Sequence, residues 1–409
     1  MNSCPRTIHH RLPSYPGVTS YQGVTSCPGK NRLRPARPRG RSSVMTLLVF
    51  SVLLAACSMP EQPLSELPPK DFEPGVRIAF GSCNEQNRSQ DYWSGMTDYY
   101  DAGPGFPDVW IWAGDNVYAD TEELAVMKQA YARVLDGPYG QFAQRCRASG
   151  CNIVGTWDDH DFGANNLRGY VSPGPLPEDS PFRRISKAER KAALIEFLGE
   201  PSASRTAARE QVYAAYDFVR PQLRVRVNVL DVRYDRQRGG RKILGGEQWA
   251  WLESKLLDDA IDLQLVVSSS QVLRLDPSKD TWGEFPEERE RLLGLIARSP
   301  AQGVVLLSGD IHAGEVSRLG SDQERRFGIG YPLYEITSSG LNKVRCLLGV
   351  CHYGWQNHYQ LGLAIAPNFG ELAIARRNHD IVVWAAIRST DSPAGKPLLG
   401  KVIHFSGEH

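Results

Sequence analysis

The chain contains the stretch Pro107-Asp-Val-Trp-Ile-Trp-Ala-Gly-Asp-Asn-Val-Tyr118, in which an apolar run leads directly into polar side chains. The run 109–113 predicts a buried strand. It stops at Gly114, and a carboxylate, an amide and a phenol follow. Loops at strand ends are where open α/β folds collect oxygen ligands for hard metal ions. Asp115 is therefore a candidate metal-bridging carboxylate.

The overall composition is that of an ordinary globular protein. The 409 residues carry a formal net charge of +1, with 41% hydrophobic and 23% charged residues. This length and composition predict one large domain, with or without a small appendage. The balanced charge argues against a dedicated nucleic-acid binder, which usually has a basic domain. We expect a monomer.

The N-terminal region has the features of an export signal. Residues 1–44 are rich in Pro, Gly, Ser and Arg and lack a helix or strand period, which predicts a disordered, basic leader. The apolar run 45–56 is shorter than the roughly 20 residues of a membrane-spanning helix. Basic residues before a short apolar core indicate a signal peptide. Met45 is an alternative start of the chain.

The end of this apolar run reads Leu54-Ala-Ala-Cys57, which resembles the bacterial lipoprotein box. Cys57 is then the lipidated first residue of the mature protein, and 57–75 is a polar, Pro-rich tether. The alternative is an ordinary signal peptide with an unrelated cysteine. Ser58 in place of Asp favours the outer membrane. We therefore expect an exported protein in the cell envelope or periplasm, anchored to a membrane by lipid.

In an exported protein, cysteines are candidates for disulfide bonds, because oxidising compartments permit them. Five cysteines follow Cys57: Cys83, Cys146, Cys151, Cys346 and Cys351. Four of them form two closely spaced pairs in polar or Gly-containing stretches, which predicts the disulfides Cys146–Cys151 and Cys346–Cys351. Pairing between the two groups stays open. Cys83 is left over, and metal binding is a reason to keep an unpaired thiol.

Alternating apolar runs and helix-like stretches indicate an α/β domain over 76–405. The predicted strands are 76–80, 109–113, 152–157, 223–230, 263–267 and 304–307. The predicted helices are 121–135, 186–198, 247–257 and 286–297. The tail 331–405 looks like further strands of an antiparallel sheet beside the first, with a turn at Asn368-Phe-Gly370.

Four of the predicted strands end in side chains that bind metals. The endings are Cys83, Asp115 with Tyr118, Asp159 with His160, and Asp310 with His312. Single endings of this kind are often helix caps or turns. Cys, Tyr and His together suit a transition metal such as iron, whereas carboxylates suit calcium, magnesium or manganese. Two such metals would clamp a phosphoryl group and activate a water.

Four motifs resemble the PhoD-like (alkaline phosphatase D) branch of the metallophosphoesterases. They are Gly81-Ser-Cys83, Gly114-Asp-x-x-Tyr118, Trp157-Asp-Asp-His-Asp161 and Ser308-Gly-Asp-x-His312. The resemblance covers roughly 76–340. It implies an α/β fold, a β-sandwich of two mixed sheets flanked by helices. It also implies a phosphatase or phosphodiesterase site that depends on calcium and iron.

The resemblance assigns roles residue by residue. Iron would be held by Cys83, Asp115, Tyr118 and His312. Calcium, or another divalent ion such as Mg or Mn, would be held by Asp115, Asp159 and Asp310. Asp115 would bridge the two metals, and His160 would be the catalytic acid. Asp161 stands where relatives often have Glu.

Three residues are candidate contacts for substrate: Asn116, Asn165 and Arg168. An Arg suits bidentate phosphate recognition, although 165–168 also reads as a surface loop. The predicted function is a lipid-anchored, metal-dependent phosphoesterase of the cell envelope. It would hydrolyse small phosphomonoesters, phosphodiesters or both through a metal-bound hydroxide. The alternative is a non-catalytic envelope lipoprotein that binds a metal or another ligand.

Overall fold

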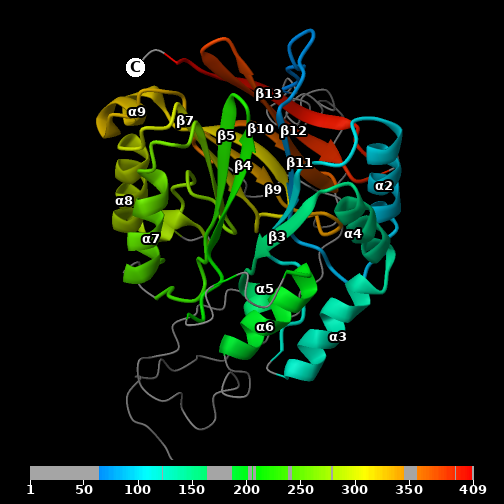
Figure 1. The fold of residues 1–409 in the computed structure, drawn as a ribbon. Coiled ribbons are helices and arrows are strands. Elements are labelled where there is room, and N and C mark those ends of the chain that lie inside the picture. Colours follow the sequence, from blue (N-terminus) through cyan, green and yellow to red (C-terminus); the bar gives the residue numbers. More distant parts are fainter. Residues whose placement is uncertain are drawn as a thin grey trace, which may run out of the picture. The chain divides into compact units, whose positions relative to one another are not determined.

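Two mixed β-sheets form the framework of the protein (Figure 1). The computed structural model describes residues 64–407, except for 122, 164–186, 201–204, 206–208, 238–241, 278–279, 345–356 and 392. All of these residues belong to one compact unit, Glu61–His409. Among them, no helix has the length and apolar character needed to cross a bilayer.

The first sheet has the strand order β13-β12-β11-β1-β2-β3. Its strands are β1 Val76–Gly81, β2 Val109–Ala113, β3 Asn152–Thr156, β11 Asn368–Arg377, β12 Asp380–Ser389 and β13 Pro397–Phe405. β1, β2 and β3 are parallel, whereas β11, β12 and β13 add antiparallel pairs at the side of β1. The parallel strands therefore end at the same edge of the sheet.

The second sheet has the strand order β10-β8-β9-β7-β6-β5-β4. Its strands are β4 Ala214–Arg220, β5 Leu223–Val229, β6 Leu263–Ser268, β7 Gly303–Ser308, β8 Gly314–Arg318, β9 Tyr334–Ser338 and β10 Gln360–Ala364. β5, β6, β7 and β9 are parallel. Apolar side chains from both sheets, including Ile111, Val305 and Ile374, share one buried core.

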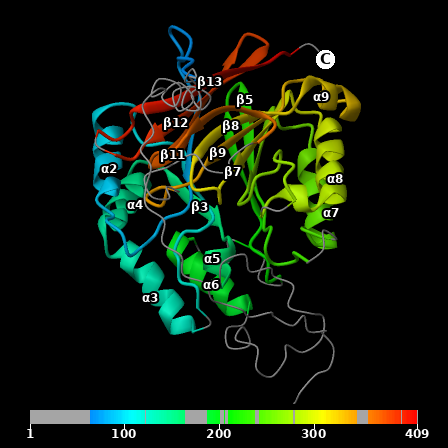
Figure 2. The same ribbon diagram turned by 180° about the vertical axis from the view of Figure 1, so that it is seen from behind.

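Helices cover the outer face of each sheet (Figures 1 and 2). The first sheet packs against α2 Tyr92–Ala102, α3 Leu124–Leu135, α4 Pro138–Ala148 and α6 Lys187–Leu198. The second sheet packs against α7 Gly246–Leu256 and α8 Pro286–Ala297, with α9 Ser321–Phe327 beside α8. The short helix α5, Asp159–Phe162, follows β3. The predicted fold class, an α/β sandwich of two mixed sheets, is confirmed.

The apolar pattern of the sequence predicted the positions of many helices and strands. β2 and α8 have the predicted bounds, because each has a clear boundary: Gly114 ends the strand, and Pro286 begins the helix. The predicted helix 186–198 is observed as α6 from Lys187, since residue 186 lies outside the described residues. The sequence did not predict α2, α4, α5, α9, β4 or β8.

One prediction about the tail is wrong, and another is confirmed only in part. The segment Asn368-Phe-Gly370 is not a turn but the start of β11, paired with β12 from Asn368 onward. A Cβ on Gly370 would lie 2.2 Å from the ring of Phe80, so the glycine makes room for that ring. The predicted antiparallel strands beside the first sheet are present as β11, β12 and β13, but the tail strands do not all belong to one sheet. β11 pairs with β1, whereas β9 and β10 belong to the second sheet, because the chain crosses between the layers.

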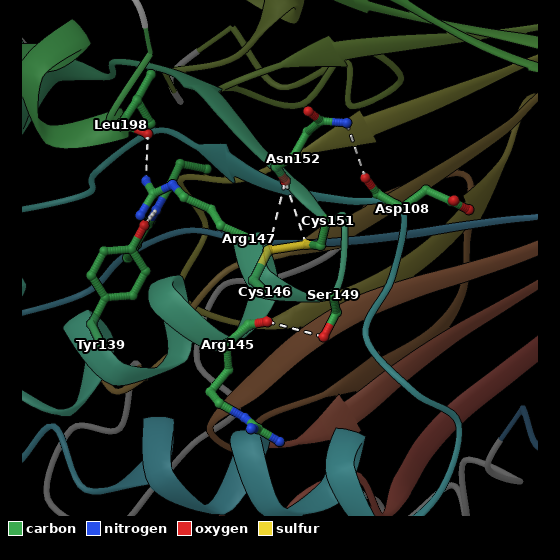
Figure 3. Close-up of a disulfide and its surroundings, with 10 residues drawn as sticks. Asp108, Tyr139, Arg145, Cys146, Arg147, Ser149, Cys151, Asn152 and Leu198 are labelled. Carbon is green, nitrogen blue, oxygen red and sulfur yellow. Dashed lines mark hydrogen bonds between the residues drawn. A yellow bond between two sulfur atoms is a disulfide. The ribbon is translucent and has the colours of Figure 1, made fainter.

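The predicted disulfide Cys146–Cys151 is confirmed (Figure 3). It links the last turn of α4 to the residue before β3, so Cys146 is helical rather than in a loop. The backbone oxygen of Asn152 lies beside both sulfurs, and Arg147 reaches the carbonyl of Leu198 at 2.9 Å. The bridge thereby holds the start of the strand that leads to Asp158. Cys346 and Cys351 lie outside the described residues, as do Cys57 and the predicted leader.

Candidate metal centre

The loops that follow four parallel strands meet at one place, where the carboxyl ends of the two sheets come together. Cys83 follows β1, Asp115 follows β2, the Asp158 turn follows β3, and Asp310 follows β7. Backbone hydrogen bonds tie the loops together: Asn84 donates to the Asp115 carbonyl at 2.9 Å. All of these side chains except that of Asp310 are almost completely buried.

The backbone turns sharply at the residues that carry these side chains. Cys83, Asp115, Asp310 and His312 have φ values of 59°, 48°, 71° and 59°. Such left-handed conformations are uncommon for residues other than glycine and cluster at functional sites. Gly114 is also left-handed, and a Cβ there would lie 2.7 Å from the Asp158 Cβ. The loops are therefore packed too closely for a larger residue at that position.

A sulfur, a phenol and an imidazole surround one oxygen of Asp115. Asp115 Oδ2 accepts a hydrogen bond from the Tyr118 hydroxyl at 3.1 Å and lies 3.5 Å from Cys83 Sγ. The Tyr118 hydroxyl is 3.0 Å from His312 Nε2. Ligand atoms of Cys83, Asp115 and His312 all lie within 4.8 Å of one another. The structure thus brings together the four residues predicted to hold iron.

The other side of Asp115 faces a group of carboxylates. Oxygens of Asp115, Asp158, Asp159 and Asp310 lie within 4.8 Å of one another. Asp158 was not among the predicted ligands, although its position beside Asp159 in the Trp157 motif was a signal. Its Oδ1 accepts from Ser269 Oγ at 2.7 Å, and its buried Oδ2 has no hydrogen-bond partner within the described part of the chain.

Burial and mutual repulsion oppose ionisation of this cluster. Burial, followed by the charges of Asp159 and Cys83, raises the pKa of Asp115 well above its ordinary value. Burial, followed by Asp158, does the same to the pKa of Asp310. Burial also raises the pKa of the Cys83 thiol. A multivalent cation would offset this repulsion, so the residues present fit a metal site.

Arg233 is the counter-ion behind the carboxylates. Its guanidinium is fully buried, makes a hydrogen-bonded ion pair with Asp158, bonds Asp280 at 2.6 Å and lies 3.8 Å from Asp159. Arg236 makes a second ion pair with Asp280. These ion pairs occupy the guanidinium of Arg233 with carboxylates of the protein itself. The network also connects the Asp158 turn to the loop before Trp282.

Asp161 holds the loop that carries Asp115. It accepts hydrogen bonds from the backbone nitrogens of Asn116 and Val117 at 3.1 and 3.2 Å. The Asn116 side chain is fully buried, and its amide donates to the Thr156 carbonyl at 3.0 Å. The substrate role of Asn116 stays a prediction, and Asn165 and Arg168 lie outside the described residues.

His160 lies at the edge of the cluster. Its backbone nitrogen donates to Asp159 Oδ1 at 3.1 Å, and its ring lies against the Tyr118 ring with centroids 4.1 Å apart. Its Nδ1 is 2.7 Å from Asp120 Oδ1. Lys343 Nζ also lies 3.2 Å from the Tyr118 ring centroid. The sequence reading missed Asp120 and Lys343; the only signal for Asp120 was its place two residues after Tyr118.

Fold and site together define an α/β-sandwich protein with a buried centre suited to two metal ions. Residues 78–347 match the family described as PhoD-like phosphatase, and the chain belongs to that family. Alkaline phosphatase D of Bacillus subtilis (strain 168) is 26% identical over 220 residues, which are 46% of this chain and 36% of the relative. The match therefore spans about a third of that relative's length.

Two solved structures show weaker similarity. The first is described as GAP50, the anchor in the inner membrane complex of Plasmodium. It has 13% identity and a TM-score of 0.47, with 82% of this chain and 90% of that chain covered. Vps29 of Chaetomium thermophilum has 9% identity and a TM-score of 0.29, with 82% and 100% covered. Both similarities are too weak to carry an argument about this chain.

Proposed function

We propose that the protein is a metal-dependent hydrolase of phosphoric esters. The observation that carries the proposal is Asp115, which takes part in all three groups of side chains that lie close enough to hold a metal ion. A carboxylate shared by two metal sites is the arrangement that clamps a phosphoryl group in two-metal hydrolysis. Membership of the PhoD-like phosphatase family supports the same chemistry. The substrates are phosphomonoesters, phosphodiesters or both.

The donor types divide the centre into two halves. The half suited to iron contains Cys83, Asp115, Tyr118 and His312. The half suited to calcium or another hard divalent ion contains Asp115, Asp158, Asp159 and Asp310. When bound, the metals would supply positive charge for the phosphoryl oxygens and an activated water.

The chain's own groups orient the ester and handle the proton. His160 has a ring nitrogen within 4.8 Å of carboxylate oxygens of Asp115 and Asp159, so it lies beside the place where the phosphoryl group would sit. From there it passes a proton to the leaving oxygen as the phosphorus–oxygen bond breaks. The close packing around Cys83 and Asp115 excludes bulk water, which strengthens electrostatic interactions at the centre.

The proposed location is the cell envelope, with Cys57 as the lipid-bearing residue. The disulfide Cys146–Cys151 supports export, because such bonds persist mainly in oxidising compartments. Mass spectrometry of the protein extracted from membranes tests the anchor. A diacylated N-terminal Cys57 is the expected result, and an unmodified Cys57 in the membrane fraction contradicts it.

Activity is tested on protein that begins after Cys57. The measurements are metal content and turnover of an aryl phosphate monoester and diester by wild type, Asp115→Asn and His160→Ala. Asp98→Asn, at an exposed position on α2, is the matched control. We expect Asp115→Asn to lose bound metal and turnover. We expect His160→Ala to keep its metal and lose about 10²- to 10⁴-fold in kcat.

The outcomes separate enzyme from binding protein. Equal turnover by wild type, Asp115→Asn and His160→Ala would show that the site assignment is wrong. Stable metal binding without turnover of either ester by the wild type would favour a non-catalytic protein that uses the centre for structure or ligand binding.

A further inference from the structure

The segment 64–72, part of the predicted tether, is paired with the edge strand of the first sheet. The Leu64 carbonyl accepts a hydrogen bond from the Gly400 nitrogen at 2.7 Å, and the Glu66 nitrogen donates to the Gly400 carbonyl at 2.9 Å. Ser65 thereby forms a parallel bridge to β13. We call 64–72 the strap. It covers part of β13, whose backbone groups would otherwise be an exposed edge of the sheet.

Side chains of the first sheet also hold the strap. Trp384 Nε1 donates to the Glu66 carbonyl at 3.0 Å, and the Glu66 carboxylate accepts from the Val402 nitrogen at 2.8 Å. The same carboxylate makes an ion pair with Lys401. At the end of the strap, Phe72 packs against the small apolar cluster that contains Trp384. Backbone, charged and apolar contacts thus make the strap part of the folded domain.

Leu64 lies where the edges of the two sheets meet. β13 is the last strand of the first sheet, and β10 is the last strand of the second. The Leu64 side chain packs on the core that both sheets share. A Cβ on Gly362 of β10 would lie 3.0 Å from Leu64 Cβ and 3.2 Å from the side chain of Leu399 of β13. The strap, β13 and β10 therefore form one side of the sandwich, which we call the strap side.

The metal centre lies away from the strap side. In the first sheet, β12 and β11 separate β13 from β1, and in the second, β8 and β9 separate β10 from β7. Neighbouring strands are about 4.8 Å apart, so the strands that lead to the metal centre are roughly 14 Å from either edge. Figure 1 shows the strap, drawn in blue, beside β13, with α3 and α6 at the opposite end of the domain.

The docked strap shortens the reach of an anchor at Cys57. Leu64 is seven residues after Cys57, and an extended chain spans at most about 3.6 Å per residue, so the two are no more than about 25 Å apart. A tether that was free as far as Val76, where β1 begins, would reach about 70 Å. A lipid on Cys57 therefore keeps the strap side near the bilayer, whereas a free tether would let the domain turn in any direction.

Two exposed leucines lie on the strap side. Leu67 of the strap is 73% exposed, and Leu361 of β10 is 47% exposed. Leu67 is three residues after Leu64, and Leu361 directly precedes the glycine that lies against Leu64. Single exposed leucines are common on soluble proteins. Beside a lipid anchor, however, such side chains can enter the interface between headgroups and acyl chains, so a lipid bilayer is a partner that fits this side.

We propose that the strap orients the anchored protein, with the strap side against the bilayer and the metal centre held away from it. This inference rests on the proposed lipid anchor at Cys57 and is independent of the proposed hydrolysis of phosphoric esters. The competing explanation is a free tether, in which the strap detaches easily and the domain has no preferred orientation. The two explanations differ in which surface positions approach the lipid.

The first experiment measures that approach on the full-length lipidated protein. The protein is placed in vesicles of phosphatidylethanolamine and phosphatidylglycerol that contain a lipid with a nitroxide on its headgroup. A fluorophore is attached to Leu361→Cys on the strap side or to Val126→Cys on α3, which is similarly exposed at 45%. Wild type labelled in parallel corrects for the native cysteines. Because nitroxide quenching acts only at short range, we expect several-fold stronger quenching at position 361 than at position 126.

A second measurement does not depend on lipid. It uses protein that begins at Ser58 and contains the whole compact unit Glu61–His409. Amide hydrogen exchange should show that the Glu66 and Gly400 amides are protected. In Glu66→Ala, the Gly400 amide should exchange at least about tenfold faster, because the bonds of the carboxylate are lost. Leu67→Ala, an exposed neighbour, should leave the rate unchanged.

Four results would overturn the proposal. Equal quenching at positions 361 and 126, or stronger quenching at 126, contradicts the orientation. Unprotected Glu66 and Gly400 amides in the wild type contradict a docked strap. A difference in quenching that persists after Glu66→Ala has released the strap shows that something else orients the protein. An unmodified Cys57 removes the proposed anchor and the orientation with it, and hydrogen exchange then shows separately whether the strap is docked.

Discussion

Replacing Asp161 by Ala is the most direct test of how the fold holds the metal centre. Asp161 is 1% exposed, and its carboxylate accepts hydrogen bonds from several donors. The donors are the backbone nitrogens of Asn116, Val117 and Asp158, the Asn116 side-chain amide and the Tyr131 hydroxyl. Alanine would leave these donors facing a small cavity, although the Asn116 amide keeps the Thr156 carbonyl as an acceptor.

The expected loss of stability follows from these contacts. A buried donor left without an acceptor costs about 1–3 kcal/mol. The loop will shift and water will reach part of the cavity, so the costs do not add in full. We expect Asp161→Ala to lower the free energy of unfolding by about 4 kcal/mol, near the upper end for single substitutions. Asp161→Asn keeps the shape of the side chain, but its amide nitrogen faces one of the donors and cannot accept a hydrogen bond. This variant should therefore lower the free energy of unfolding by about 2 kcal/mol.

The same change should weaken the metal centre. Asn116 and Val117 directly follow Asp115, whose left-handed backbone is held in part through these two nitrogens. Urea unfolding of metal-free protein measures the stability, and metal analysis at equal protein concentration measures the binding. Asp98→Ala on α2 controls for the loss of an exposed carboxylate. A loss below about 1 kcal/mol, or full metal content in the folded Ala variant, would show that Asp161 does not hold the Asp115 loop.

Other predictions concern groups away from this loop and the metal itself. Burial raises the pKa of Glu335 from 4.5 to about 7. The protonated side chain therefore contributes its full stabilisation of the folded protein below pH 4.5, and this contribution is lost as the pH rises through 7. Between pH 4.5 and 8, the free energy of unfolding measured in urea should fall by about 3 kcal/mol less in Glu335→Gln than in the wild type. An equal fall in both proteins would contradict this prediction. Reducing Cys146–Cys151, which are five residues apart, should cost about 2 kcal/mol in urea unfolding, and an unchanged midpoint would exclude a structural role. Removing the metal with a chelator should lower the melting temperature, and a melting temperature that does not depend on metal would argue against the site. The affinity for metal should fall as the pH falls, because the pKa of Asp115 is raised and protons compete with the metal for its carboxylate.

Some elements of the fold were predictable because their signals are local. The run Val109–Ala113 is wholly apolar, bounded by Gly114, and buried on both faces as a central parallel strand. The helix from Pro286 has a proline at its first turn and acidic residues after it. Each signal lies within a few residues of the element that it predicts, so no knowledge of distant contacts was needed.

The errors in the tail come from contacts between distant residues. Gly370 looks like a turn residue in the sequence, but its missing side chain makes room for Phe80, nearly 300 residues earlier in the chain. The pairing of β11 with β1 likewise joins the two ends of the domain. Local composition carries no information about such a partner, so the turn was wrong and the tail strands were wrongly assigned to a single sheet.

Some residues of the metal centre could also be predicted from local sequence, whereas others could not. Cys83, Asp115 and His312 were visible as candidates because each directly follows a strand. Asp120 was not, because its bond to His160 joins two different strand ends. Asp158 was passed over because the family resemblance assigned the ligand role to Asp159, which directly precedes His160. In the structure, both contribute oxygens to the cluster.

Hydrogen bonds within the protein hold the strained backbone at the centre. Left-handed residues cost of order 1–3 kcal/mol each and persist only where the surroundings hold them. Here the Asp115 carbonyl accepts from the Asn84 nitrogen at 2.9 Å, and the His312 nitrogen donates to Ser339 Oγ at 2.6 Å. Since these bonds need no metal, chelation should lower stability through carboxylate repulsion while leaving the ligand loops in place. The centre would then bind metal with little rearrangement, and Asp115 would already be oriented toward both halves.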